Sequence, residues 1–222
     1  MTVKTLNPDD YITRRGIMMV MSSPSGAGKT TLANKLLEIN PMMRLSISHT
    51  TRAPRPHEVN GKDYNFCSVE EFEKLKEQGE FLETAKVFGN FYGTQKAPVK
   101  ESLTTGYDVL FDIDWQGTQQ LAQKMGERVV SIFVLPPSMV ELEKRLHNRS
   151  ADSDDTIALR MSQAATEISH WAEYDYVIVN NCLDESIGHV KDILNVERLR
   201  RERQWGLSNF IEALVSEEKV ED

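Results

Sequence analysis

A short loop between two patterned segments constrains this 222-residue chain more than any other feature. The run Gly16–Met21 is apolar, residues 22–30 read Ser-Ser-Pro-Ser-Gly-Ala-Gly-Lys-Thr, and a helical pattern follows over Thr31–Glu38. This order predicts a buried strand, a loop and a helix. The loop nearly matches the phosphate-binding pattern G-x-x-x-x-G-K-[ST], with Ser23 in place of the first glycine. A Gly/Ser turn without a ligand is the alternative, and the strand-loop-helix context favours the phosphate loop.

The residue types in this loop suit a phosphate group. Gly26 and Gly28 allow backbone N–H groups to turn inward around an anion, and the following helix N-terminus adds its positive dipole end. Lys29 can reach terminal phosphates, and Thr30 offers a hydroxyl to Mg²⁺. We therefore expect a nucleotide phosphate site here.

Three further apolar runs lack alternation and predict buried parallel strands, at 108–111, 129–135 and 176–179. Helical patterns separate them, one from Ser138 to about Asn148 and one from about Thr156 to Trp171. The predicted fold class is α/β, with a parallel sheet core and helices on both of its faces.

The texture changes in three other places. Residues 45–98 predict a small mixed α+β insert: Leu45 to Ser48 alternate as a half-exposed strand, Asn60-Gly61 is a hairpin signal, and a capped helix runs from Ser68 to Gly79. Residues 136–165 are rich in charge. Beyond Asp184 we expect a helix that ends near residues 205–206, in which the arginines of 198–203 form a solvated face or a subunit contact.

Composition excludes several classes of protein. The formal net charge of -8, from 26 Lys+Arg against 34 Asp+Glu, argues against a nucleic-acid binder, because counterion release needs surplus cations. Cys67 and Cys182 show neither zinc nor disulfide spacing, the five histidines show no metal-ligand spacing, and no apolar segment reaches membrane length. We expect a cytoplasmic protein with a disordered tail over residues 1–15.

Two acids follow the strand predicted at 108–111, where open α/β sheets place their ligands. Asp112 and Asp114 share a face by alternation, and one carboxylate near Lys29 is suited to hold the water shell of Mg²⁺. Surface acids that simply end a strand are the alternative.

The insert contains a second set of candidate binding residues. Arg52 and Arg55 lie in an extended segment, and their forks suit bidentate phosphate contacts, although a solvated basic loop would look the same. Tyr64 and Tyr92 can add hydroxyl contacts, or can simply pack. Glu83 lies among apolar neighbours, where a carboxylate can accept two N–H bonds from a guanine edge; a solvent-facing glutamate is the alternative.

Two arginines flank the acidic segment after the helix predicted from Ser138. Arg149 and Arg160 are suited to stabilise charge on a transferring phosphoryl group from a movable lid. Salt bridges with nearby aspartates on a helix surface are the alternative.

Taken together, these residues resemble the guanylate kinases, P-loop kinases that move a phosphoryl group from ATP to GMP. The resemblance covers about Gly16 to Leu194. It rests on segments in the family's order, namely residues 23–31, Ser48 to Glu58, Val59 to Tyr64, Gly89 to Thr94 and Phe111 to Gly117. It implies a P-loop NTPase-type core over 16–44, 99–135 and 166–206, a GMP-binding insert over 45–98, a lid over 136–165, and a C-terminal helix with an acidic tail over 207–222.

The resemblance also implies residue roles. ATP would be held by residues 23–31, that is by Ser23, Pro24, Ser25, Gly26, Ala27, Gly28, Lys29, Thr30 and Thr31, and by Asn180 on the adenine side. Ser48, Glu83 and Thr94 would bind guanine, and Arg52, Arg55, Tyr64 and Tyr92 would hold the GMP phosphate, with Glu58 beside the arginines and Asp114 near GMP. Mg²⁺, carried as MgATP, would meet Thr30 and Asp112, partly through water. Lys29, Arg52, Arg149 and Arg160 would be catalytic.

Two other functions remain open at this level. Guanylate-kinase-like domains of scaffold proteins bind partners without catalysis, but they tend to lose the phosphate loop, which is intact here apart from Ser23. A related kinase for a phosphorylated sugar would have no use for Ser48, Glu83 and Thr94. The resemblance also admits a homo-oligomer through the C-terminal helices.

Overall fold

The computed structural model describes residues 7–148 and 154–217 of the chain. A five-stranded parallel sheet in the order β10-β9-β2-β8-β3 forms the centre. Its strands are β2 (Met18–Ser22), β3 (Met43–Leu45), β8 (Asp108–Asp112), β9 (Val129–Leu135) and β10 (Tyr176–Val179). The helices around it are α1 (Lys29–Ile39), α3 (Lys96–Thr104), α4 (Trp115–Met125) and α7 (Leu183–Arg198).

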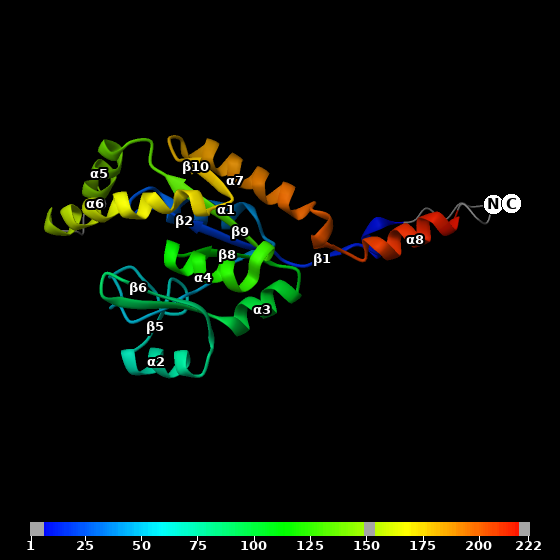
Figure 1. Cartoon of the computed structure of the whole chain (residues 1–222), viewed down its shortest axis with the longest axis horizontal. Helices are drawn as coiled ribbons and strands as arrows, with labels where there is room; N and C mark the ends of the chain where they lie inside the picture. The colour runs from blue at the N-terminus through cyan, green and yellow to red at the C-terminus, as the bar shows by residue number, and fades with distance from the viewer. Residues whose placement is uncertain (1–6, 149–153, 218–222) are drawn as a thin grey trace.

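Strand β2 is buried on both faces, as its unbroken apolar run predicts. Met19 and Met21 pack on one side in a cluster that includes residues of α1 and α7, whereas Met18 and Val20 pack on the other with residues of α3 and α4. Successive side chains of a strand point to opposite faces, so β2 supplies both layers of the core. The α/β class with helices on both faces is thereby confirmed (Figure 1).

The insert is a second, four-stranded sheet in the order β5-β4-β7-β6, below the core in Figure 1. It contains β4 (His49–Thr50), β5 (Asn65–Phe66), β6 (Phe81–Val87), β7 (Asn90–Gln95) and helix α2 (Val69–Glu77). The hairpin predicted at Asn60-Gly61 is wrong: Gly61 takes a positive φ in a turn, but β4 and β5 pair in parallel. The hairpin of this sheet joins β6 to β7 through Phe88 and Gly89, both with positive φ.

Two helices carry the charged segment. Helix α5 (Met139–Asn148) begins after Ser138, whose hydroxyl accepts the N–H of Glu141 at 3.1 Å as the capping pattern predicts. Helix α6 (Asp154–Ser169) runs unbroken through the expected lid boundary at 165, and α3 likewise runs through the expected insert boundary at 98. The residue composition changes near positions 98 and 165, but neither change interrupts a helix.

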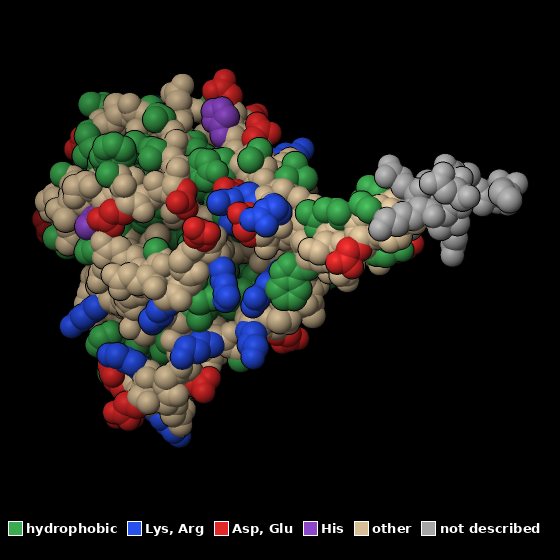
Figure 2. Space-filling model, turned by 45° about the vertical axis from the view of Figure 1, so that its right-hand side comes forward, with side chains coloured by type: hydrophobic (Ala, Val, Ile, Leu, Met, Phe, Trp, Pro, Cys, Tyr) green, Lys and Arg blue, Asp and Glu red, His purple; other side chains and the backbone are tan. Residues whose placement is uncertain are grey.

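The N-terminal segment is more ordered than expected from residue 7 onward. A 3-10 turn, η1 (Pro8–Asp10), precedes strand β1 (Thr13–Arg14), which pairs antiparallel with β11 (Gln204–Trp205). The tail predicted as disordered over 1–15 is therefore wrong for residues 7–15. Helix α8 (Leu207–Glu217) follows and projects from the body as an arm (Figures 1 and 2).

Helix α7 ends at Arg198 and not near residue 205, so the predicted helix end is wrong. Arg200 and Arg201 are exposed, as a solvated face predicts, whereas Arg198 is half-buried. Arg198 Nε lies 3.0 Å from Oδ2 of Asp108, a fully buried carboxylate that also pairs with Arg14 and accepts the N–H of Ile17 at 2.9 Å. Short 3-10 turns follow α4, α6 and α7, namely η2 (Gly126–Arg128), η3 (His170–Glu173) and η4 (Arg201–Arg203). Asp108 thus ties the start of β8 to strand β1 and to the end of α7.

Within residues 7–148 and 154–217, no helix is both long enough and apolar enough to cross a membrane.

Candidate functional site

A cavity of about 810 Å³ opens between the loop after β2, the insert sheet and the two helices α5 and α6. Its lining brings together residues that are far apart in the chain. From the loop and α1 come Ser23, Pro24, Ser25, Gly26, Gly28, Lys29, Thr30 and Thr31; from the insert come Ser48, Arg52, Arg55, Tyr64, Glu83 and Tyr92; other lining residues include Asp112, Asp114, Arg145, Arg160, Glu167 and Asn180.

The loop has the backbone that its glycines predict. Gly26 and Gly28 have φ values of +94° and +99°, which L side chains rarely adopt. Ser23 does not share this requirement, because Phe88 is the single non-glycine residue with positive φ in the described part of the chain. Serine is therefore compatible with the backbone at position 23, and its hydroxyl donates to the carbonyl of Pro24 at 3.0 Å.

Asn180 supports this loop from behind. Its Nδ2 donates to the carbonyl of Ala27 at 2.8 Å, and its Oδ1 accepts from the Ser186 hydroxyl at 3.0 Å. A Cβ at Gly28 would collide with the same amide. The side chain expected to contact adenine thus has both polar ends engaged within the protein, although it also lines the cavity.

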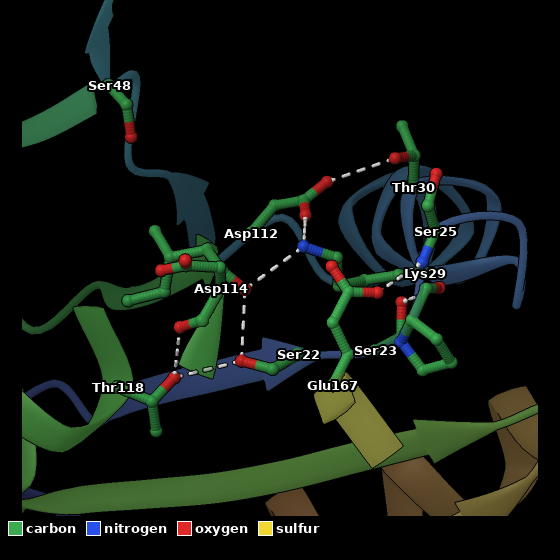
Figure 3. A network of polar contacts seen from close by, with 12 residues as sticks. Ser22, Ser23, Ser25, Lys29, Thr30, Ser48, Asp112, Asp114, Thr118 and Glu167 are labelled. Carbon is green, nitrogen blue, oxygen red and sulfur yellow. Dashed lines mark hydrogen bonds and ion pairs between the residues drawn. The ribbon is translucent and has the colours of Figure 1, made fainter. Parts of the chain in front are cut away.

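Lys29, Thr30 and Asp112 meet at the carboxyl end of β8 (Figure 3). The Lys29 ammonium pairs with Oδ1 of Asp112 and donates to the carbonyl of Ile113 at 3.1 Å. The Thr30 hydroxyl lies 3.2 Å from Oδ2 of Asp112. A hydroxyl and a carboxylate oxygen thus face the cavity together, which is a donor set suited to a hard cation such as Mg²⁺.

Asp114 caps helix α4. Its Oδ1 accepts the N–H of Gly117 at 3.0 Å, and its Oδ2 accepts from the amide of Gln116 at 3.0 Å. Burial raises the pKa of Asp114, while these hydrogen bonds and the charge of Lys29 oppose that rise. The predicted shared face of Asp112 and Asp114 places both carboxylates on the cavity wall.

In the insert, Glu58 organises the two predicted arginines. Its carboxylate accepts from Arg52 at 2.8 Å and 3.0 Å, and its Oε1 lies 3.6 Å from Nη1 of Arg55. Although burial opposes it, the bonds from Arg52 and from the Arg55 backbone hold the pKa of Glu58 below its usual range. Tyr64 and Tyr92 lie beside them with ring centroids 6.0 Å apart. The guanidinium of Arg52, held by two hydrogen bonds, therefore lies with that of Arg55 and two phenols on one side of the cavity.

Glu83 is buried, with only 2% of its surface exposed, so the solvent-facing alternative is wrong. Thr94 donates to Oε1 of Glu83 at 2.7 Å, and the hydroxyls of Ser48 and Thr94 lie 3.4 Å apart. Burial raises the pKa of Glu83 to about 7, against the hydrogen bond from Thr94. A Cβ at Gly117 would come within 2.6 Å of Oε2, so glycine permits the close approach of α4 to this carboxylate.

The helices α5 and α6 bring further charges to the loop. Nη1 of Arg160 lies 3.0 Å from the Ser25 hydroxyl, whereas Arg149 lies outside the described residues. Arg145 donates to the carbonyls of Ala27 at 3.3 Å and Asn180 at 3.2 Å. In the sequence, Arg145 is one of several charged residues in 136–165, and no motif marks its contact with Ala27, 118 positions away.

Glu167 is the other residue that the sequence did not indicate. Its Oε2 accepts the backbone N–H of Ser25 at 3.2 Å (Figure 3). The signal available in the sequence was its spacing: Glu167 lies seven positions, or about two turns, after Arg160 on the same helix. Within the described residues, no cluster of three or more His, Cys, Asp or Glu side chains is suited to a metal ion.

Comparison with known proteins agrees with this geometry. A family model described as guanylate kinase matches residues 15–197. The chain is 59% identical over 203 residues to the guanylate kinase of Paramagnetospirillum magneticum, covering 91% of this chain and 95% of that protein. It is 56% identical over 205 residues to that of Bradyrhizobium diazoefficiens, covering 92% and 94%. The crystal structure of guanylate kinase from Anaplasma phagocytophilum superposes with a TM-score of 0.78 at 43% identity, covering 90% of this chain and 96% of that one.

Proposed function

This chain belongs to the guanylate kinase family and catalyses transfer of a phosphoryl group from ATP to GMP, and on that premise we propose which side chains bind each substrate. One observation carries the assignment: a single cavity is lined both by the phosphate loop and by the arginines, tyrosines and buried glutamate of the insert. Two nucleotides bound at these two sides would point their phosphates toward each other.

ATP binds on the loop side. The backbone N–H groups of the loop and the ammonium of Lys29 hold its phosphates, supported by the inward turn at Gly26 and Gly28 and by the helix N-terminus that follows. Asn180 acts mainly by fixing the Ala27 carbonyl, which keeps the loop in shape. This differs from direct contact with adenine and follows from its two internal hydrogen bonds.

Mg²⁺ enters as MgATP, and Thr30 and Asp112 would hold it. Their oxygens are 3.2 Å apart on the cavity wall, and the absence of a larger acidic cluster in the described ranges fits an ion whose remaining ligands are water and phosphate. Bound there, the ion would neutralise charge that develops on the phosphate oxygens.

GMP binds on the insert side. Arg52 and Arg55, with Tyr64 and Tyr92, hold its phosphate, and Glu58 keeps the two guanidinium groups in place beforehand. Preorganised cations lower the barrier because they need not reorient as charge develops. Ser48, Glu83 and Thr94 bind guanine, and the ionised Glu83 accepts its two adjacent N–H groups.

In the reaction, the side chains of the protein hold the two nucleotides in position and form no covalent bond with them. In-line transfer needs the GMP phosphate oxygen and the terminal phosphate of ATP held in contact, with cations around the transferring group. Lys29 and Arg52 approach from opposite sides of the cavity, and Arg160 approaches from α6. The catalytic role that we propose for Arg149 rests on the sequence resemblance alone, because this residue lies outside the described ranges. Asp114 lies on the wall near the acceptor phosphate.

Lys29→Met tests the loop assignment. Its uncharged side chain has a similar length, so the loop should keep its shape while losing the cation. We expect turnover in a coupled ADP-release assay with ATP, Mg²⁺ and GMP to fall by at least 100-fold, with little change in GMP affinity. Normal turnover in this variant would refute the proposed phosphate site. Lys35→Met, an exposed change on the same helix, is the matched control.

A further inference from the structure

A carboxylate of the chain itself occupies a donor of the phosphate loop. Oε2 of Glu167 accepts the N–H of Ser25 at 3.2 Å, and Figure 3 shows this side chain reaching from α6 into the loop beside Lys29. Backbone N–H groups of such a loop are the donors that bind phosphate oxygens. Glu167 therefore satisfies a donor that the polyphosphate of ATP would otherwise use.

The surroundings of the Glu167 carboxylate act on its charge in opposite directions. Burial raises the pKa of Glu167, against the Ser25 N–H bond and the charges of Lys29 and Arg160, while Asp114 adds to the rise. Lys29 comes from α1, Arg160 from α6 and Asp114 from the N-cap of α4. The hydrogen bond from Ser25 and the two cations therefore hold the carboxylate in place against the cost of its burial.

Glu167 and Arg160 act on the same loop residue. Glu167 accepts from the Ser25 backbone, and Arg160 donates to the Ser25 hydroxyl at 3.0 Å. They are seven positions apart, so they lie on one face of α6, two turns from each other. Helix α6 thus contacts Ser25 through an anion and a cation at once.

We infer that Glu167 is a positioning residue that takes the place of a phosphate oxygen at Ser25 in the nucleotide-free enzyme, and that the polyphosphate of ATP displaces it. This inference rests on the proposed function of the loop. A phosphate oxygen and a carboxylate oxygen compete for the one Ser25 hydrogen, and their like charges repel at this distance. Glu167 therefore keeps the loop and α6 together without ligand and weakens the binding of polyphosphate.

Glu167→Gln separates charge from shape, because glutamine keeps an acceptor oxygen for Ser25 and removes the negative charge. At pH 8, we expect the variant to bind MgATP at least threefold more tightly than the unaltered enzyme. Magnesium tripolyphosphate, which has no base or sugar, should show the same gain, because the competition is with phosphate. KM for GMP should stay unchanged. Binding is measured by calorimetry.

The sign of the change distinguishes this role from a purely structural one. If Glu167 only stabilised the loop, its replacement would weaken ATP binding; weaker or unchanged binding overturns the inference. Glu212→Gln on α8 is the matched control, with the same charge change on an exposed position outside the cavity. Thermal unfolding checks that each variant is folded, and Glu167→Asp, which retracts the carboxylate by one methylene, should also tighten binding if the glutamine variant does not fold.

The two proposals fail in different ways. If Lys29→Met binds MgATP and tripolyphosphate as well as the unaltered enzyme does, the loop assignment itself fails. If Lys29→Met loses binding while Glu167→Gln matches the unaltered enzyme, only the role of Glu167 fails.

Discussion

Burial disfavours the charged form of a carboxylate, and Glu83, which is proposed to bind guanine, is such a buried carboxylate. The pKa of Glu83 is raised to about 7 by burial, so the side chain changes charge within the physiological range. Only the ionised form offers an acceptor oxygen to each of the two N–H groups of guanine, because one oxygen of the protonated acid carries a hydrogen and acts as a donor.

GMP binding should therefore depend on pH through Glu83. When the pH falls from 8 to 6, it passes below the pKa of Glu83, and the ionised fraction of this side chain drops to about a tenth. KM for GMP should therefore rise about tenfold. The GMP phosphate itself titrates near pH 6. Glu83→Gln measures that background and should give a higher but flatter profile. A steep profile that survives in Glu83→Gln would contradict the assignment.

At this scale, the sequence indicated residues that carry a motif or an unusual neighbourhood. Glu83 stands out in the sequence because a lone acid among apolar residues needs a reason to be there. Glu167 was missed because it occupies an ordinary position on an amphipathic helix, and its partner lies 142 positions away.

At the scale of elements, the end of β10 and the phosphate loop are joined by one amide. Asn180 donates to Ala27 in the loop and accepts from Ser186 in α7, so it connects three segments. It is nearly fully buried, and removing it leaves the Ala27 carbonyl and the Ser186 hydroxyl without these partners.

Asn180→Ala should therefore cost about 1–3 kcal/mol of unfolding free energy, because the Ser186 hydroxyl loses its acceptor and the Ala27 carbonyl keeps only the 3.3 Å bond from Arg145. It should also raise KM for ATP severalfold, since the loop loses its support, while KM for GMP changes little. Denaturant unfolding and steady-state kinetics measure the two effects. Asn195→Ala, at an exposed position of α7 outside the cavity lining, is the control. An equal loss for both nucleotides would indicate general damage.

Elements with strong local signals were predicted well, and those that depend on distant partners were not. The capping patterns at Ser68 and Ser138 mark real helix starts. The Asn60-Gly61 signal reports only local turn geometry, and the strand that pairs with β4 there runs parallel. Strand β11 interrupts what reads as a continuing helix because its partner, β1, comes from the other end of the chain.

At the scale of the whole molecule, Asp108 connects the N-terminal segment, the central sheet and the end of α7. Its carboxylate is fully buried, forms ion pairs with Arg14 and Arg198, and accepts a hydrogen bond from the N–H of Ile17. Removing one member of a buried ionic group leaves the others without compensation.

Asp108→Asn should destabilise the protein by about 3–5 kcal/mol, because two arginines then lose their counter-charge. Activity at low temperature should be retained, since Asp108 is not among the residues that line the cavity. Denaturant unfolding measures the loss, with Glu212→Gln as the control. A change below about 0.5 kcal/mol would mean that water satisfies these arginines.

The unbroken course of α6 also has a mechanical consequence. Its 16 residues make a rod about 24 Å long, which begins at Asp154 and ends at Ser169, where the backbone tightens into η3. If that end is the pivot, Arg160 lies about 13 Å from it and Glu167 only about 3 Å. Displacing Glu167 by a few tenths of an ångström would then move Arg160 roughly four times as far, so a small rotation of the helix at the phosphate loop would be a larger displacement at Arg160.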